Sequence, residues 1–183
     1  MLDLSKDEEA GKFLEGTGSI VLDRVNRVAY VALSERSDAD EAAKWAASLH
    51  YSLVTFTASD AQNRPIYHTN VMMAVGTSVA VVCLECVADA AERARLRQSL
   101  EGTGHEIVDI SREQVNKFCG NVLELEHVQG YPVLVMSTQA YNGFTQAQRE
   151  TLLKHERDLI HADIATLERI GGGGVRCTIA ELF

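Results

Sequence analysis

The chain has 183 residues, of which 46% are hydrophobic and 23% charged, a composition typical of a folded globular protein. Its length predicts one domain with a sizeable core. The net charge of −9 argues against a nucleic acid or an anionic membrane surface as a standing partner. No apolar run approaches the ~18 residues that a membrane-spanning helix needs.

The N-terminal residues and the cysteines both bear on cellular location. Residues 1–9 are acidic and lack the basic and then apolar layout of a signal peptide. The four cysteines do not follow the layout of a secreted disulfide framework. We therefore expect a reduced, cytoplasmic protein, with residues 1–12 as a lead-in and residues 13–183 as the folded domain.

Segments typical of strands and helices recur in a fixed order along the chain. The first group comprises strands at 20–22 and 28–33, a helix at 38–49 and a strand at 53–56. The second comprises strands at 71–75 and 79–83, a helix at 89–100 and a strand at 106–110. The third comprises strands at 122–126 and 133–136, a helix at 146–155 and a strand at 159–162. Thr145 and Gln148 form a capping box at the start of the third helix.

The order strand, strand, helix, strand thus occurs three times, with starts roughly 50 residues apart. A period of this length predicts units arranged around an axis or stacked in a row, because one unit cannot bury its apolar face alone. The alternative is an α+β sandwich in which the repetition is accidental. We favour an α/β fold built of ββαβ units.

Cys177 is the first candidate for chemistry. It follows a run of four glycines and Arg176, and the pattern predicts a last short strand at 178–183. Glycines allow the backbone to approach a ligand closely, and a nearby arginine favours the thiolate. The alternative is that Cys177 is a small buried apolar residue of that strand.

His68 is the second candidate, because it precedes an apolar run and so lies where a strand begins. Site residues often gather in such segments. Asn70 would project to the same side as His68 in an extended stretch and bind the same ligand. The alternative is that His68 is an exposed loop histidine.

Two acidic residues are further candidates. Glu35 lies between a predicted strand and a helix start, where a carboxylate can hold a guanidinium group or tune a proton. Acidic residues also favour helix starts for electrostatic reasons alone. Glu15 lies among glycines that permit close backbone approach, and the same two interpretations apply to it.

Cys83 and Cys86 form a CxxC motif, but no second pair completes a four-thiolate zinc site. The motif leaves a predicted strand and does not start a helix, which favours a structural role over a redox role. His155 and His161 lack the four-residue spacing of a helical zinc motif. The sequence therefore predicts no metal site.

Five short motifs occur in one order that resembles the guanidino-group modifying (pentein) superfamily of arginine deiminases, amidinotransferases and dimethylarginine hydrolases. They are Leu14-Glu15-Gly16-Thr17-Gly18-Ser19, Leu33-Ser34-Glu35-Arg36-Ser37, Ile66-Tyr67-His68-Thr69-Asn70-Val71, Gly120-Asn121-Val122-Leu123-Glu124-Leu125 and Gly172-Gly173-Gly174-Val175-Arg176-Cys177. The chain is most similar to the citrulline-utilisation, amidinotransferase-like branch. The resemblance implies an α/β propeller of five units, of which this chain holds about three.

The resemblance also implies roles. Cys177 is expected to be the nucleophile, His68 the general acid and base, and Glu35 an acidic residue that contacts the guanidinium group. Asn70 stands where deiminases and amidinotransferases carry an aspartate, which favours a neutral ureido substrate such as citrulline over arginine. Glu15, Arg36 and Arg176 are expected to bind substrate, and no metal or organic cofactor is implied. Deiminases have Glu-Gly-Gly-Asp where this chain has Glu15-Gly16-Thr17-Gly18. The aspartate that binds the substrate guanidinium group in deiminases is therefore absent from this chain.

The expected reaction is hydrolysis of a C–N bond in citrulline, arginine or a derivative. Two alternatives stand beside it: a catalytically idle truncated subunit or binding module, and an amidinotransferase that uses an amine acceptor in place of water. A redox role for Cys83 and Cys86 is a more distant alternative. Because the N-terminal propeller units are expected to be missing, the exposed unit edges predict a homo-oligomer or a complementing chain.

Overall fold

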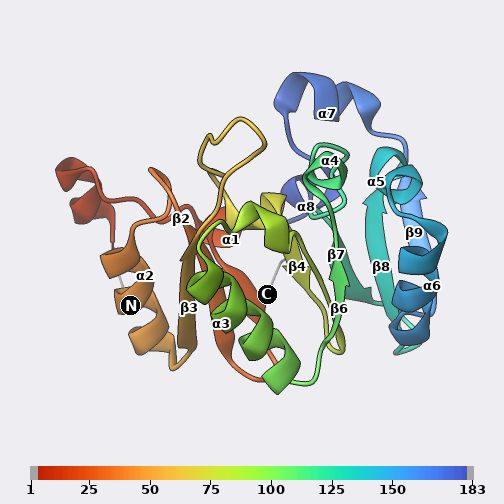
Figure 1. The fold of residues 1–183 in the computed structure, drawn as a ribbon, viewed down its shortest axis with the longest axis horizontal. Coiled ribbons are helices and arrows are strands. Elements are labelled where there is room, and N and C mark those ends of the chain that lie inside the picture. Colours follow the sequence, from red (N-terminus) through yellow and green to blue (C-terminus); the bar gives the residue numbers. More distant parts are fainter. Residues whose placement is uncertain (1–3, 181–183) are drawn as a thin grey trace.

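The computed structural model describes residues 4–180, and within them the three predicted ββαβ units are present (Figure 1). Each unit forms its own three-stranded sheet. The first contains β1 (Val21–Asp23), β2 (Val28–Leu33) and β3 (Ser52–Thr57), and the second contains β4 (Met73–Val75), β5 (Val79–Val82) and β6 (Glu106–Asp109). The third contains β7 (Leu123–Glu126), β8 (Pro132–Ser137) and β9 (Leu159–Ala162).

All three sheets have the same topology. The first two strands pair antiparallel, as in the register Val21↔Tyr30, and the second pairs with the third in parallel, as in Val28↔Ser52. The central strands β2 and β5 are almost continuously apolar, because both of their faces are covered. The repeat read from the sequence is therefore a repeat in space.

The three predicted helices are confirmed, and their ends are set by side-chain caps. They are α2 (Ala39–Leu49), α3 (Ala90–Gly102) and α6 (Gln146–His155). Asp38 and Asp89 accept hydrogen bonds from the first turns of α2 and α3. The capping box predicted for Thr145 and Gln148 is present at the start of α6.

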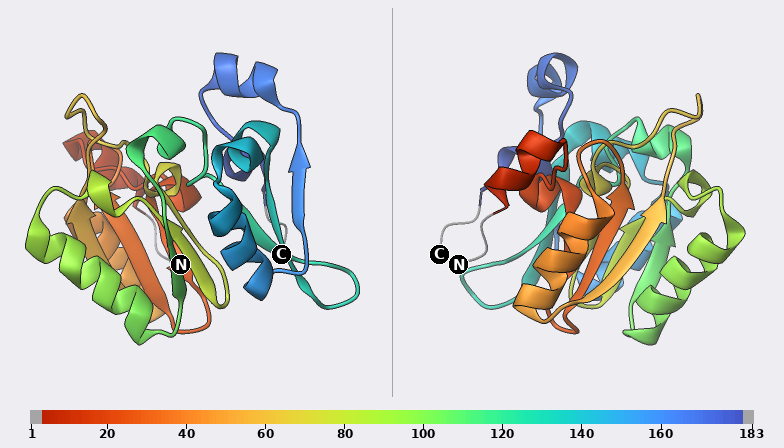
Figure 2. Two further views of the ribbon diagram at one scale, coloured as in Figure 1. Left: turned by 45° about the vertical axis from the view of Figure 1, so that its right-hand side comes forward. Right: turned by 90° about the vertical axis from the view of Figure 1, so that its left-hand side faces the viewer.

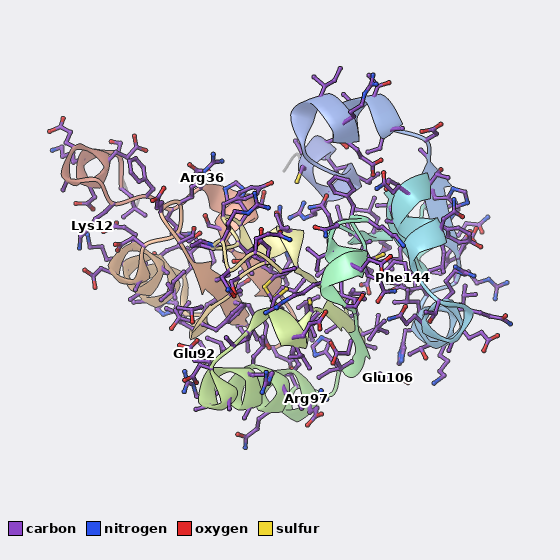
Figure 3. All side chains as sticks on the ribbon, turned by 45° about the horizontal axis from the view of Figure 1, so that its top comes forward. Lys12, Arg36, Glu92, Arg97, Glu106 and Phe144 are labelled. Carbon is purple, nitrogen blue, oxygen red and sulfur yellow. The ribbon has the colours of Figure 1, made fainter. Side chains whose placement is uncertain are left out.

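Each later helix also contacts the third strand of the preceding unit. Glu92 at the start of α3 accepts hydrogen bonds of 2.8 Å from the backbone N–H and the hydroxyl of Thr57 in β3. Lys154 and His155 at the end of α6 lie 2.8 Å from the carboxylate of Glu106 in β6. Figure 3 shows Glu92 and Glu106 at these two junctions. The junction between units is thus repeated along with the unit itself.

Shorter elements connect the units, and sequence periodicity predicted none of them. They are η1 (Ser5–Ala10), α1 (Gly16–Ser19), η2 (Thr69–Val71), η3 (Leu84–Cys86), α4 (Arg112–Val115), α5 (Thr138–Gly143), α7 (Ala165–Gly171) and α8 (Val175–Thr178). Helices of one or two turns are too short to display a 3.6-residue pattern. Within the expected lead-in, η1 is joined to α2 by an ion pair of 2.9 Å between Asp7 and Lys44.

The last predicted strand is wrong over 178–180. Thr178 ends the helix α8, and residues 179 and 180 belong to no strand, while 181–183 lie outside the described residues. The predicted strand at 71–75 is also shortened, because Val71 belongs to η2 and β4 begins at Met73. In both places a helical turn replaces the start of an apolar run.

The first strands of the units, β1, β4 and β7, lie side by side around a common axis (Figure 2). One cluster of buried apolar side chains runs through all three units and includes Phe56, Met73 and Met136. No helix within residues 4–180 is long and apolar enough to cross a membrane. The arrangement places the segments that precede β1, β4 and β7 at one end of the axis.

Glu156, which caps the C-terminal end of α6, is buried, and neither carboxylate oxygen has a hydrogen-bond partner in the described chain. Burial, and then the neighbouring Glu124, raise the pKa of Glu156 from 4.5 to about 8. Between these two values the folded protein holds a proton that the unfolded chain has released. Stability therefore falls as the pH rises through this window.

We expect Glu156→Gln to reduce this pH dependence, because glutamine is neutral at every pH. For the wild type, Glu156 contributes a fall of at most about 1.4 kcal/mol per pH unit in the free energy of unfolding. Urea unfolding at about pH 5 and about pH 8 measures the difference. Glu150→Gln, on the exposed face of the same helix, is the control. Equal pH dependence in wild type and Glu156→Gln would contradict the assignment.

Candidate active site

The candidate residues occupy equivalent places in the repeat. Glu15 directly precedes α1 and β1, His68 caps η2 ahead of β4, and Asn121 lies two residues before β7. Cys177 lies in α8, which follows the third unit. Because β1, β4 and β7 are neighbours, these segments meet at one end of the axis.

His68 forms a close pair with Glu15. Its Nε2 lies 2.6 Å from Glu15 Oε2, and the His68 side chain is 17% exposed. Gly18 packs against the imidazole, since a Cβ atom there would lie 2.7 Å from His68 Nδ1. The glycine is therefore needed for the histidine to reach its place. A carboxylate at one ring nitrogen fixes the orientation of the imidazole.

Arg36 extends this pair. Its guanidinium lies 3.6 Å from Glu15 Oε2 and 5.2 Å from the centre of the Tyr67 ring. The turn that carries Glu35 and Arg36 is held to the His68 segment, because the Ser34 hydroxyl donates to the Tyr67 carbonyl at 2.8 Å. Glu35 itself is exposed and makes no hydrogen bond or ion pair with any residue in the described range.

Cys177 is the exposed member of the four cysteines, and its thiol accepts a hydrogen bond from Asn121. The distance from Asn121 Nδ2 to Cys177 Sγ is 3.2 Å, and the same amide donates to the Asn70 carbonyl at 2.9 Å. Asn121 is 2% exposed. A buried amide donor favours the thiolate form of a cysteine that accepts from it.

The glycine run before Cys177 allows this close packing. A Cβ atom on Gly173 would lie 2.9 Å from Cys177 Cβ, and one on Gly174 would lie 2.8 Å from Asn121 Oδ1. Gly172 has φ +71°, a conformation that favours glycine, and it ends α7. The run thus both ends one helix and starts the next against Asn121.

Tyr67 connects the two halves of the site. Its ring centre lies 4.9 Å from that of His68. Burial raises the pKa of Tyr67, the nearby Cys177 thiolate adds to the increase, and Arg36 opposes it. Tyr67 therefore lies within electrostatic range of both Cys177 and Arg36. Tyr67 and Asn121 were not assigned roles from the sequence, although both stand inside motifs that carry the resemblance.

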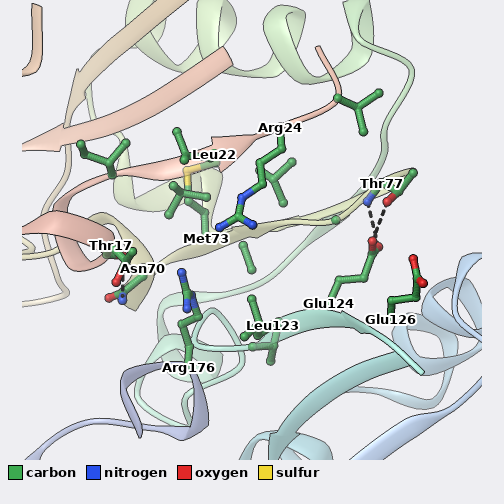
Figure 4. A pocket seen from close by; sticks show the side chains of 17 residues that line it. Thr17, Leu22, Arg24, Asn70, Met73, Thr77, Leu123, Glu124, Glu126 and Arg176 are labelled. Carbon is green, nitrogen blue, oxygen red and sulfur yellow. Dashed lines mark hydrogen bonds between the residues drawn. The ribbon is translucent and has the colours of Figure 1, made fainter. Parts of the chain in front are cut away.

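A cavity of about 380 Å³ runs along the inner strands from the Asn70 end toward Thr77 (Figure 4). Arg176 extends into it from α8, and Arg24 from the end of β1, while Cys177 does not line it. Asn70 is buried and donates to the Thr17 carbonyl at 3.2 Å, and its Oδ1 has no hydrogen-bond partner within residues 4–180. No group of three or more metal-ligating side chains is present in that range.

Removal of the Asn121 amide tests its contact with Cys177. We expect Asn121→Ala to slow alkylation of Cys177 by iodoacetamide at neutral pH by about 10-fold, because a hydrogen bond to a charged group contributes about 1.5–3 kcal/mol. Asn121→Asp is expected to slow it further, since a second negative charge opposes the thiolate. Asn116→Ala, at an exposed position, is the control. An unchanged rate of Cys177 alkylation in Asn121→Ala would contradict the assignment.

A model of the family described as eukaryotic N,N-dimethylarginine dimethylhydrolase matches residues 1–183. The superfamily predicted from the motifs is confirmed, and the matching model is that of its dimethylarginine hydrolases rather than its citrulline-utilisation branch. No curated protein sequence matches the chain significantly.

Solved structures with the same fold include ArgZ, an arginine dihydrolase from Cyanobacteria, with 15% identity and a TM-score of 0.70 over 90% of this chain and 24% of that chain. The substrate-bound N-terminal domain of ArgZ has 16% identity and a TM-score of 0.68, over 89% of this chain and 54% of that domain. The C. jejuni agmatine deiminase has 10% identity and a TM-score of 0.52, over 94% and 59%. This chain thus spans a quarter to three fifths of these relatives.

These likenesses confirm the α/β fold class that the repeat predicts, with three units of a propeller in the described range. The family match spans every motif that carries the candidate residues. By that match, the chain belongs to the N,N-dimethylarginine dimethylhydrolase family of guanidino-group modifying proteins.

Proposed function

We propose that the chain hydrolyses a carbon–nitrogen bond in the guanidino or ureido group of an arginine-type compound. The observation that carries the proposal is that Asn121 joins the segments of two oriented groups, since its amide donates both to Cys177 and to the carbonyl of Asn70 in the His68 segment. Cys177 accepts a hydrogen bond from a buried amide, and His68 is paired with a carboxylate at 2.6 Å. A nucleophile and an acid–base group, each with an orienting partner, are what covalent hydrolysis requires.

The proposed reaction has two steps. The Cys177 thiolate attacks the central carbon, so that a C–S bond forms, and the C–N bond then breaks as the leaving nitrogen takes a proton from the His68 imidazolium. In the second step His68 accepts a proton from water while the water oxygen adds to the same carbon. The C–S bond breaks and the thiolate is restored, with no net change in the protein.

The other candidate residues would orient His68 or bind the substrate. Glu15 orients the imidazole and Arg36 lies against the Glu15 carboxylate, which replaces the substrate-binding role expected for both from the resemblance. The exposed carboxylate of Glu35 is available to a substrate guanidinium. Asn70 offers the carbonyl oxygen of its side chain to a substrate N–H, and an amide there suits a neutral ureido group as well as a cationic one. Arg176 extends into the cavity beside Asn70, where it suits an anionic group of the substrate.

The names of the relatives support this substrate class. Arginine, agmatine and N,N-dimethylarginine, which those names contain, all carry a guanidino group. The metal-free and cofactor-free mechanism above uses side chains of this chain alone. A reduced cytoplasmic compartment suits it, because the thiol must stay free.

We also propose that a second copy or a complementing chain closes the site. The third strands β3 and β6 are covered by α3 and α6 of the following unit, whereas Ile160 on β9 is 44% exposed. Sedimentation of the pure protein at several concentrations tests this. A monomer at every concentration, with full activity, would contradict it.

The experiment that tests the function is labelling with a haloacetamidine, which carries an amidine group like that of the substrate. Fast labelling confined to Cys177, and slowed in His68→Ala, is expected for an assembled site. Equal labelling of Cys177 in folded and denatured protein would support the idle-subunit alternative. Release of amine or ammonia from N,N-dimethylarginine, arginine, agmatine and citrulline would then identify the substrate, and dependence on added glycine or ornithine would indicate an amidinotransferase.

A further inference from the structure

Cys83 and Cys86 lie in the turn after β5, which the proposed hydrolysis does not use. β5 ends at Val82, Cys83 precedes η3, and Cys86 ends it. Residues three apart in a 3₁₀ turn eclipse each other, so this turn places one thiol above the other. The Cys83 N–H donates to the Met72 carbonyl at 3.0 Å, next to the segment that carries His68 and Asn70.

The two thiols are in contact and closed off from solvent. Cys83 is 0% and Cys86 1% exposed, and the Cys86 Sγ lies 3.1 Å from the Cys83 Sγ. Both cysteines are free thiols, and this hydrogen bond holds their sulfur atoms next to each other. We propose that Cys83 and Cys86 form a redox-active dithiol, which closes to an intramolecular disulfide on reaction with a hydroperoxide.

Charged neighbours distinguish the two thiols. The hydrogen bond with Cys83, and then the Arg112 guanidinium, lower the pKa of Cys86, whereas burial and Glu85 oppose the change. The same hydrogen bond, together with burial, raises the pKa of Cys83. Arg112 is anchored beside the pair, since it donates from its side chain to the Glu85 carbonyl at 2.7 Å. The positive charge of Arg112 near Cys86 is the reason to assign Cys86 as the attacking sulfur and Cys83 as the resolving one.

The reaction balances with the hydroperoxide as the only co-reactant. The Cys86 thiolate attacks one peroxide oxygen, the O–O bond breaks, and a sulfenic acid forms. The other oxygen takes up the proton that the Cys86 thiol released and leaves as water or an alcohol. The Cys83 sulfur then attacks the Cys86 sulfur, an S–S bond forms, and the hydroxyl group leaves with the Cys83 proton as water. Two thiols thus lose two electrons to the peroxide.

Cys119 provides an internal comparison. It is 0% exposed, like the pair, but its thiol faces the Ala140 carbonyl at 3.4 Å and no second sulfur. Burial raises the pKa of Cys119 to about 12. A lone buried thiol of this kind is inert, so faster oxidation of the pair would come from the second sulfur and from the charge of Arg112.

The test is oxidation of the full chain by hydrogen peroxide, followed by catalase, denaturation and alkylation with N-ethylmaleimide. Mass spectrometry is expected to show the segment with Cys83 and Cys86 lighter by two hydrogen atoms and without alkylation. This product is expected to form at least about tenfold faster than any oxidation of Cys119, and a dithiol reductant should reverse it. The readout does not involve turnover, so it is independent of the proposed hydrolysis.

Two variants assign the roles. Cys83→Ser is expected to leave a sulfenic acid on Cys86 that dimedone traps, and Cys119→Ser is expected to leave disulfide formation unchanged. The proposal would be overturned if wild-type Cys83 and Cys86 both remain open to alkylation once Cys119 begins to oxidise. The wild-type measurement decides this even if a variant folds poorly.

Discussion

Replacement of Cys177 by serine is expected to lower turnover of a guanidino substrate by at least about 1,000-fold. A serine hydroxyl in this place stays protonated, because Asn121 and the surrounding groups can stabilise a thiolate but not an alkoxide at neutral pH. Substrate binding should change little, since the residues that line the cavity are untouched. The measurement is kcat and KM with the best substrate of the panel, together with loss of haloacetamidine labelling.

Cys119→Ser is the matched control for this variant. It replaces a cysteine outside the site, and serine can keep a hydrogen bond to the Ala140 carbonyl. We expect Cys119→Ser to keep turnover and labelling close to wild type. If Cys177→Ser retained more than a tenth of wild-type turnover, covalent catalysis by this residue would be wrong and another nucleophile would be required.

Replacement of His68 by asparagine is expected to lower kcat by about 100- to 10,000-fold, because both proposed steps need a proton transfer from or to the imidazole. Glu15→Gln should give a smaller loss, of about 10-fold, since glutamine can still orient the ring but is a weaker, neutral acceptor for its N–H than the carboxylate of Glu15. The pH profile of kcat/KM is the second readout. Its histidine limb should vanish in His68→Asn.

His127→Asn, in the turn after β7, is the control for the histidine change. Circular dichroism and thermal unfolding establish that each variant is folded before its kinetics are compared. Equal losses in kcat for Glu15→Gln and His68→Asn, with an unmoved pH profile, would mean that the pair stabilises structure and does not transfer protons.

The regular elements could be predicted from the sequence because local physics determines them. The bounds of α6 and β9 agree with prediction, since a capping box starts α6 and the apolar period is undisturbed. β2 and β5 are apolar runs that pack on both faces, and such runs are typical of buried strands. The repeat then follows from the order of these elements.

The short turns could not be predicted in the same way. A single helical turn such as α8 contains fewer residues than one full period of an amphipathic pattern. Its place depends on Gly174, which packs closely against Asn121, a residue far earlier in the chain. The strand expected at 178–183 is therefore wrong over 178–180 because a contact distant in sequence overrides local preference.

The pairings within the site are equally distant in sequence. His68 meets Glu15 and Cys177 meets Asn121 because equivalent segments of different units converge, and no local pattern reports such convergence. Sequence motifs identified Cys177, His68 and Glu15 as candidates, but only the structure shows which of them touch. Their chemical roles stay predictions until the variants above are measured.

The equivalent placement of these residues has a consequence for how the protein loses activity. Each sheet is closed within its own unit, whereas the site draws one segment from every unit. A slight separation of neighbouring units would break the site while all sheet hydrogen bonds remained. Catalytic activity is then a more sensitive measure of tertiary order than circular dichroism. Activity should be lost at a lower denaturant concentration than secondary structure.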